Sequence, residues 1–240
     1  MDGDVEAAAT GDDPELQALV DRLERLDACA VSDALDRVGL PAGVGGLRPM
    51  TVPGRVVAGR VITVEVGPRQ DERPAPHLAT EAVVSAGATD VLVVANGGRT
   101  DVSSWGGILS TAAMARGVRG VVVDGVCRDV DESAAMGFPV FARGAIPVTA
   151  RGRVVQRSFN EPVECAGVRV EPGDLAIADG SGVVFVPRAR APEVIEIAEG
   201  IVALETAMAE AVRAGRPVTE VMHDSSFQQD RPGQARRGGL

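Results

Sequence analysis

The chain has 240 residues, 45% of them hydrophobic and 2% aromatic, and its formal net charge is −10 at pH 7. This apolar content suffices for one sizeable core, whereas the negative charge and the lack of aromatic stacking platforms argue against a nucleic-acid partner. No apolar segment approaches the ~20 residues that cross a bilayer, and the acidic start lacks the features of a signal peptide, so we expect no membrane partner and a cytoplasmic location.

The N-terminal part is predicted to contain two helices. We expect residues 1–12 to be disordered, and Asp13 then provides an N-cap for a helix whose apolar stripe runs from Leu16 to Leu26. Ser32 is predicted to cap a short second helix over residues 33–38. Both helices would bury one face.

A strand and a helix are predicted to follow. Residues 57–64 alternate between apolar and other side chains, which is typical of a strand. A loop with charges and prolines, 67–76, leads to an apolar helical pattern that starts at His77. We expect His77 to have a structural role on the face of this helix rather than a catalytic one.

The centre of the chain has the pattern of one βαβ unit. Residues 91–94 and 121–123 are predicted to be buried strands, joined by a glycine-broken loop over 96–107 and a helix over 108–116. Because crossovers between parallel strands are right-handed, the loops 96–107 and 124–129 should lie side by side at the carboxyl ends of the strands. Ligands bind at this edge in open α/β sheets.

The two loops bring together groups that suit a small carboxylate. The glycine pairs at 97–98 and 106–107 would expose backbone N–H groups at the start of the helix, where an anion is favoured. Arg128 offers a planar fork for a carboxylate or an enolate oxygen, and Asp129 offers an oxygen ligand for a divalent cation. The same residues also occur as turn glycines and as a solvated ion pair, but their predicted position at the ligand-binding edge favours a metal-assisted site.

The C-terminal half is predicted to be richer in strands. A short helix and a strand are expected within residues 130–140, and residues 146–187 contain short valine-rich strands separated by turns. Residues 191–214 are predicted to form a long amphipathic helix that Gly215 ends. This pattern indicates a β-rich layer attached to an α/β core.

Cysteine and histidine are too few for the commonest metal and nucleophile sites. Three cysteines without C-x-x-C spacing, Cys29, Cys127 and Cys165, predict buried free thiols rather than a disulfide framework or a zinc site. Cys127 adjoins an arginine that could lower its pKa, but no histidine neighbours it in sequence, which disfavours a nucleophilic role. With only His77 and His223 available, oxygen ligands and hence Mg²⁺ or Mn²⁺ are favoured.

The stretch WGGILSTAAMARGVRGVVVDGVCRDVDE resembles the RraA-like superfamily, which includes the class II 4-hydroxy-4-methyl-2-oxoglutarate and 4-carboxy-4-hydroxy-2-oxoadipate aldolases. A weaker likeness covers most of residues 25–200. It implies an α/β fold, an α/β/β sandwich with a central βαβ unit and a β-rich second layer, assembled into a homotrimer or homohexamer with sites at subunit interfaces. We therefore expect a single RraA-like domain over 13–215 and a polar C-terminal tail or arm over 216–240.

The resemblance also implies roles for particular residues. Arg128 would bind the pyruvyl oxygen and Asp129 would hold Mg²⁺, while the amides of the glycine loop would hold the pyruvate carboxylate, namely those of Gly106, Gly107, Ile108 and Leu109. The implied function is a metal-dependent lyase that releases pyruvate from a small 2-oxo diacid. It would do so by retro-aldol cleavage, in which a base removes the proton of the C4 hydroxyl, with oxaloacetate decarboxylation as a companion activity.

One departure from the aldolases concerns an acidic residue that they carry twenty-one positions before the arginine, where this chain has Gly107. Loss of a carboxylate that orders metal-bound water typically costs about 10–100-fold in metal affinity or activity. Asp124 or Asp101 could take its place, although a structural turn role for either is the alternative. A further acidic partner from a neighbouring subunit has no assigned residue.

A second function from another class remains open. Some members of the superfamily are non-catalytic regulators that bind a protein partner such as a ribonuclease. The presence of both Arg128 and Asp129 favours the enzyme, because a pure binding protein needs no metal ligand beside an anion site. A methyltransferase function is disfavoured, because no glycine-rich nucleotide loop with an acidic ribose partner follows the first strand.

Overall fold

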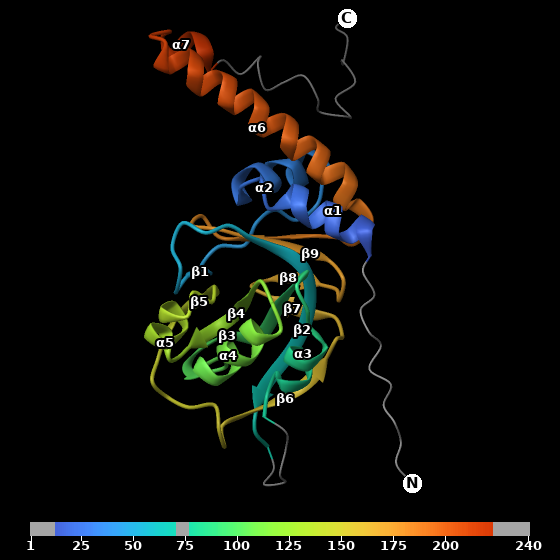
Figure 1. Ribbon diagram of the computed structural model, residues 1–240, viewed down its shortest axis with the longest axis vertical. Coiled ribbons are helices and arrows are strands. Elements are labelled where there is room, and N and C mark those ends of the chain that lie inside the picture. Colours follow the sequence, from blue (N-terminus) through green and yellow to red (C-terminus); the bar gives the residue numbers. More distant parts are fainter. Residues whose placement is uncertain (1–12, 71–76, 223–240) are drawn as a thin grey trace, which may run out of the picture.

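A computed structural model describes residues 13–70 and 77–222 (Figure 1). The predictions for residues 1–12 and for the tail from His223 onward lie outside the described residues. The helices are α1 (Pro14–Leu23), α2 (Ala28–Arg37), α3 (Thr80–Ser85), α4 (Gly107–Ala115), α5 (Val130–Ala135), α6 (Ala191–Arg213) and α7 (Val218–Val221). The strands are β1 (Arg48–Pro49), β2 (Val57–Pro68), β3 (Asp90–Ser103), β4 (Gly120–Cys127), β5 (Val140–Ala145), β6 (Val154–Phe159), β7 (Val163–Cys165), β8 (Val168–Val170), β9 (Leu175–Ala178) and β10 (Val183–Val186).

One mixed sheet dominates the molecule. Its strands follow the order β1-β5-β4-β3-β2-β9-β10, with β6 also paired to β2, and β2 to β5 run parallel. An isolated bridge between Val44 and Val183 brings the chain before β1 to the last strand, so the sheet is nearly closed. The α/β fold predicted for an RraA-like chain is confirmed.

The β-rich segment joins the main sheet more closely than the sequence suggested. Strand β2 is long enough for its first half to pair with β9 and its second half with β6. Only β7 and β8 form a separate two-stranded sheet. The strands predicted as a second layer therefore largely belong to the same sheet, which curls back on itself.

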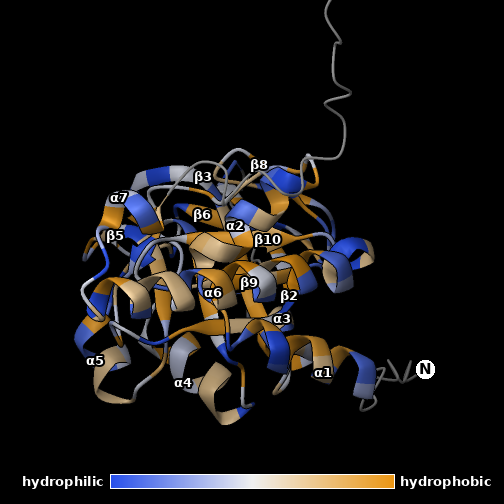
Figure 2. Ribbon diagram, turned by 90° about the horizontal axis from the view of Figure 1, so that it is seen from above, coloured by the Kyte–Doolittle hydropathy of each residue, from blue (hydrophilic) through white to orange (hydrophobic). Residues whose placement is uncertain are grey.

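Three apolar clusters fill the space between these elements. Helices α3, α4 and α5 cover one face of the sheet, and α1, α2 and α6 pack together against β9 and β10 (Figure 1). The third cluster fills the inside of the curled sheet and includes the β7–β8 hairpin. Hydrophobic residues follow the strands between these layers (Figure 2). Within the described ranges, no helix combines the length and the apolar character that crossing a membrane requires.

The helix starts show which capping signals the chain uses. Helix α1 begins as predicted, with the Asp13 carboxylate accepting hydrogen bonds from the first turn. The prediction for the second helix was wrong, because Asp27 caps α2 and Ser32 lies inside it. The buried residues Ala28, Ala30 and Val31 extend the apolar stripe toward the N-terminus, and Ser32 Oγ instead accepts from the backbone N–H of Gly43.

The predicted helix at His77 also starts later than expected. Ala79 adopts a left-handed conformation with φ 62°, and α3 begins at Thr80. His77 therefore lies before the helix rather than on its face, and its side chain is exposed.

The glycine-broken stretch after Val94 is a strand and not a loop. β3 continues to Ser103, but it makes an excursion between Ala95 and Arg99, where four steps along β3 are matched by one step along β4. Gly97 and Gly98 make this excursion possible because their φ angles are 59° and 71°, a region that favours glycine. The prediction that these glycines share one amide cradle with residues 106–107 was wrong, because each pair lines a different cavity.

Candidate functional site

A cavity of about 380 Å³ lies where β3 and β4 end. All six residues that the sequence singled out line it, namely Gly106, Gly107, Ile108, Leu109, Arg128 and Asp129. The remaining walls come from residues 77–78, 103–105 and 149–151. The crossover rule thus located the two converging segments, although β3 is longer than predicted.

The N-terminus of α4 forms one wall of the cavity. The Gly107 N–H donates to Asp129 Oδ2 over 3.0 Å, and the first bond within the helix runs from Ser110 N–H to the Gly106 carbonyl. The N–H groups of Ile108 and Leu109 have no acceptor in the part of the chain that the structure describes. Two amides, rather than the predicted row including Gly107, are thus open to an anion.

Arg128 and Asp129 face this helix end from the loop after β4. Asp129 has φ 55°, a left-handed conformation that is uncommon outside glycine, and the Arg128 N–H donates to the Trp105 carbonyl over 2.9 Å. The Arg128 Nε lies 3.1 Å from Asp129 Oδ2, and the two side chains are 37% and 33% exposed. A Cβ on Gly106 would lie 2.9 Å from Asp129 Oδ2, so a side chain at this position would displace the Asp129 carboxylate.

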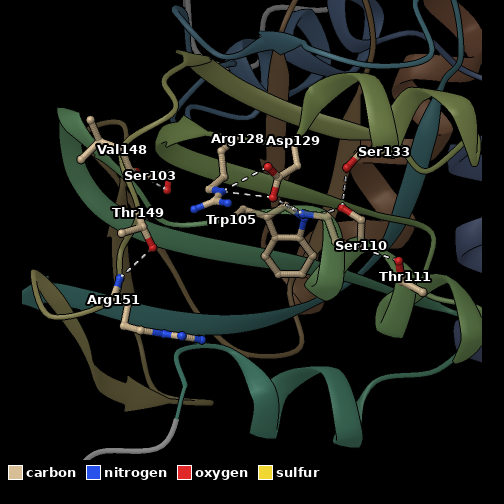
Figure 3. A network of polar contacts seen from close by, with 11 residues as sticks. Ser103, Trp105, Ser110, Thr111, Arg128, Asp129, Ser133, Val148, Thr149 and Arg151 are labelled. Carbon is tan, nitrogen blue, oxygen red and sulfur yellow. Dashed lines mark hydrogen bonds and ion pairs between the residues drawn. The ribbon is translucent and has the colours of Figure 1, made fainter.

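A buried hydrogen-bond network fixes α4 against α5 beneath the cavity (Figure 3). Ser110 Oγ accepts from Trp105 Nε1 over 2.9 Å and from the Ser133 hydroxyl over 2.8 Å. The Trp105 ring stacks on Phe138 with ring centroids 6.3 Å apart. Another buried hydroxyl, that of Ser104, lines the cavity with no partner among the described residues.

Glu132 is an acidic residue that the sequence reasoning missed; it is exposed and does not line the cavity, but it lies next to Gly107 in the α4 wall. A Cβ built on Gly107 would overlap Glu132 Oε2 and lie 2.6 Å from its Cδ, so the Glu132 carboxylate fills the space that a side chain at position 107 would occupy. Asp129 and Glu132 thus lie beside neighbouring glycines. Their spacing of three residues at the start of α5 places them on one side of the helix and was the signal that could have found the pair.

The two aspartates proposed as substitutes for the missing acid lie elsewhere. Asp124 faces the inside of the sheet, where it accepts from Arg143 Nε over 2.6 Å and from the Ala166 N–H over 2.9 Å. Asp101 is exposed and paired with Arg99. Neither aspartate lines the cavity, so both suggestions were wrong.

Two of the three thiols are buried, which disfavours the reactive thiolate form. Burial raises the pKa of Cys127 to about 11, and burial also raises the pKa of Cys165. All three cysteines are free, but Cys29 is exposed, so the prediction of three buried thiols holds for two of them. Among the described residues, no three acidic, cysteine or histidine side chains converge on one metal position. A cation here would draw fewer than three such ligands from a single described chain.

The curled mixed sheet is consistent with the fold of a known family. The family model for RraA-like proteins, described as Aldolase/RraA, matches residues 28–185. This chain therefore belongs to the RraA-like family.

Two curated relatives and one solved structure are similar to this chain. Protein DlpA of Legionella pneumophila is 28% identical over 88% of this chain, which spans only 34% of DlpA. A Halalkalibacterium halodurans protein named "Putative 4-hydroxy-4-methyl-2-oxoglutarate aldolase" is 30% identical over 75% of this chain and 81% of its own length. Streptomyces coelicolor RraAS2, described as an unusual member of the RNase ES inhibitor RraA family, superposes with a TM-score of 0.74 at 27% identity, covering 80% of this chain and 97% of its own.

Proposed function

We propose that this protein is a lyase that depends on a divalent metal and releases pyruvate from a small 2-oxo diacid. Its reactions would be retro-aldol cleavage of a 4-hydroxy-2-oxo acid, decarboxylation of oxaloacetate, or both. The observation that supports this function is the convergence of Arg128, Asp129 and the open amides of Ile108 and Leu109 on one cavity. Relatives that carry the aldolase name support the same reaction class.

The amides and the guanidinium would bind opposite ends of a 2-oxo carboxylate. The Ile108 and Leu109 N–H groups suit the carboxylate, because the start of a helix stabilises an anion by about 0.3–1 kcal/mol. The Nη groups of Arg128 have no partner within the described ranges and would donate to the 2-oxo oxygen. Charge grows on that oxygen as the enolate forms, so these donors would stabilise the transition state more than the substrate.

The residues present fit a divalent cation. Asp129 and Glu132 would hold it with carboxylate oxygens, the ligands that Mg²⁺ and Mn²⁺ prefer, while waters complete the coordination. When bound, the cation supplies Lewis-acid stabilisation of the negative charge that develops on the substrate. The Glu132 carboxylate would then take the place of the acidic residue that the aldolases carry at the position of Gly107.

The two candidate reactions make different demands on the cavity. In the retro-aldol reaction a base takes the proton of the C4 hydroxyl, the C3–C4 bond breaks, and its electron pair moves onto the pyruvyl unit. Decarboxylation of oxaloacetate forms the same enolate by loss of CO₂ and requires no base. A variant that lost only the base would therefore keep decarboxylation and lose aldol cleavage.

We infer that the working site lies between subunits of a homotrimer or homohexamer. Ile108 is 85% exposed at the edge of the cavity, although it is a large apolar side chain. An exposed apolar group beside a polar site suits burial against a second chain. A cytoplasmic location is part of the same proposal.

A coupled assay for pyruvate tests the proposal. Oxaloacetate and branched 4-hydroxy-2-oxo diacids would be supplied with Mg²⁺ or Mn²⁺, with and without a chelator. We expect Arg128→Ala to abolish pyruvate release and Asp129→Ala to remove both the activity and the metal requirement. Arg169→Ala, at an exposed arginine on β8, is the matched control and should keep wild-type turnover.

The alternative is a non-catalytic regulator that binds a protein partner such as a ribonuclease. The similarity to RraAS2 favours it. A protein that binds no divalent metal and releases no pyruvate from any of these substrates would support the regulator. Wild-type turnover in Arg128→Ala would remove the proposed role of that arginine.

A further inference from the structure

A second cavity, of about 560 Å³, lies at the open end of the curled sheet. It shares no lining residue with the candidate site. Residues of β2, β3, β4 and β5 line it, and the turn between β7 and β8 closes one side. The mouth of a curled sheet is a frequent place for small-molecule binding.

The side chain of Asn96 is the most informative part of this cavity. Asn96 is 2% exposed, and neither its Oδ1 nor its Nδ2 has a hydrogen-bond partner among residues 13–70 and 77–222. It occupies the excursion of β3 next to Gly97 and Gly98, and its amide packs on Gly125, where a Cβ would lie 3.1 Å from Nδ2. Because burying an unpaired amide is costly, this placement indicates that something else meets both atoms.

Two arginines present further unused donors to the cavity. Arg99 binds Asp101 through Nε and Nη2, but its Nη1 is buried without a partner in the described chain. Arg143 donates through Nε to Asp124, and neither of its Nη atoms has an acceptor in the described ranges. A Cβ on Gly98 would lie 3.3 Å from Arg143 Nε, so the glycine lets the guanidinium pack flat on the backbone.

The carboxylates that line the cavity do not occupy the free donors of Asn96, Arg99 and Arg143. Both oxygens of Asp124 are already used, by Arg143 and by the Ala166 N–H. The other two carboxylates, on Glu65 and Glu164, belong to exposed residues. Arg157 adds a third guanidinium, which donates to the Pro68 carbonyl.

We propose that this cavity is a second binding site, for a small oxyanion that also carries a hydroxyl group. The anionic oxygens would accept from Arg99 Nη1, Arg143 and Asn96 Nδ2, because guanidinium groups bind carboxylate and phosphate in the same way. The hydroxyl would donate to Asn96 Oδ1, the one buried acceptor of the set. A hydroxycarboxylate and a hydroxylated phosphate ester share this chemistry.

Calorimetric titration of the full-length protein tests the site. L-lactate and glycerol 3-phosphate carry both groups, and propanoate lacks the hydroxyl. We expect L-lactate or glycerol 3-phosphate to bind with a Kd in the millimolar range or below. Propanoate should bind about tenfold more weakly than L-lactate, which is the effect of one lost hydrogen bond. Binding of L-lactate would identify the anion as a carboxylate, and binding of glycerol 3-phosphate would identify it as a phosphate.

Two variants separate this site from the candidate lyase site. Asn96→Ala should weaken binding of the titrated ligand about tenfold, because a hydrogen bond to the ligand is lost, and should leave pyruvate release unchanged. Asp129→Ala should leave the titration unchanged. Asn96→Asp is a second variant of equal size, and its charge should abolish binding of the anion.

The proposal would be overturned if none of the probes bound at millimolar concentration, or if Asp129→Ala rather than Asn96→Ala removed the binding. It would also be overturned if Asn96→Ala lowered the molecular mass of the assembly, since a second copy of the chain would then supply the missing partners. None of these three results depends on whether the protein is a lyase.

Discussion

Moving one carboxylate from α5 to α4 tests whether Glu132 replaces the acidic residue that is absent at Gly107. Glu132→Ala removes the carboxylate from the side-chain space of residue 107, and Gly107→Asp in the same protein restores a carboxylate from α4 instead of α5. The backbone of Gly107 is not left-handed, so an aspartate can be placed there without strain. Removal of Glu132 also clears the overlap that any Cβ at position 107 would meet.

The expected magnitude follows from the role of a carboxylate beside a metal site. Loss of such a group weakens metal binding by about 10–100-fold, equivalent to about 1.4–2.7 kcal/mol. Glu132→Ala should show this loss, and the double variant should recover most of it. The two substitutions are thus expected to be strongly non-additive, since both act on the same volume.

Binding of Mn²⁺ to the substrate-free protein, followed by electron paramagnetic resonance, gives the affinity without any turnover. Asp131→Ala is the matched control, because Asp131 is an exposed acid next to Glu132 on the same helix. A Glu132→Ala protein that bound Mn²⁺ as tightly as the wild type would refute the reasoning. So would a double variant as weak as the single one.

Three further predictions concern stability and reactivity. Ser110→Ala should lower the free energy of unfolding by about 1–3 kcal/mol and change the emission of Trp105, because the indole N–H loses its acceptor; unchanged urea unfolding would contradict this. Asp90→Ala should cost about 3–5 kcal/mol, because the buried carboxylate pairs with Arg60 over 2.8 Å, and thermal unfolding would measure it. Iodoacetamide at neutral pH should modify only Cys29 in the folded protein and all three thiols in urea, as counted by mass spectrometry; rapid labelling of a second thiol would be inconsistent with the burial.

Local signals predicted much of the fold. The carboxylate of Asp13 and the glycines that follow α4 and α6 act where the sequence placed them, because capping involves residues close together in the chain. The predicted strand at the position of β3 was too short, because the glycine excursion interrupts its apolar run. The pairing of β3 with β4 involves residues far apart in the chain, and a local sequence pattern does not contain it. Hydrogen bonds to a neighbouring strand kept it extended.

The candidate site also has a part that the sequence predicted and a part that it did not. The convergence of Arg128 and Asp129 with the start of α4 follows from the handedness of a βαβ unit, which is a general rule. The place of Glu132 depends on how closely α5 approaches α4, and that distance is set by the buried contact between Ser110 and Ser133. The distance between α4 and α5 therefore cannot be predicted from the spacing of residues within one segment.

The pairing of β2 has a consequence for how the chain is made. On one edge of β2, residues 57–60 pair with β9 at residues 175–178, more than a hundred positions later in the chain. During synthesis the parallel strands β2 to β5 can therefore assemble while one edge of β2 is still unpaired. Such an edge invites association with other nascent chains until the last strands leave the ribosome, so closure of the sheet should be the slow and aggregation-prone step of folding.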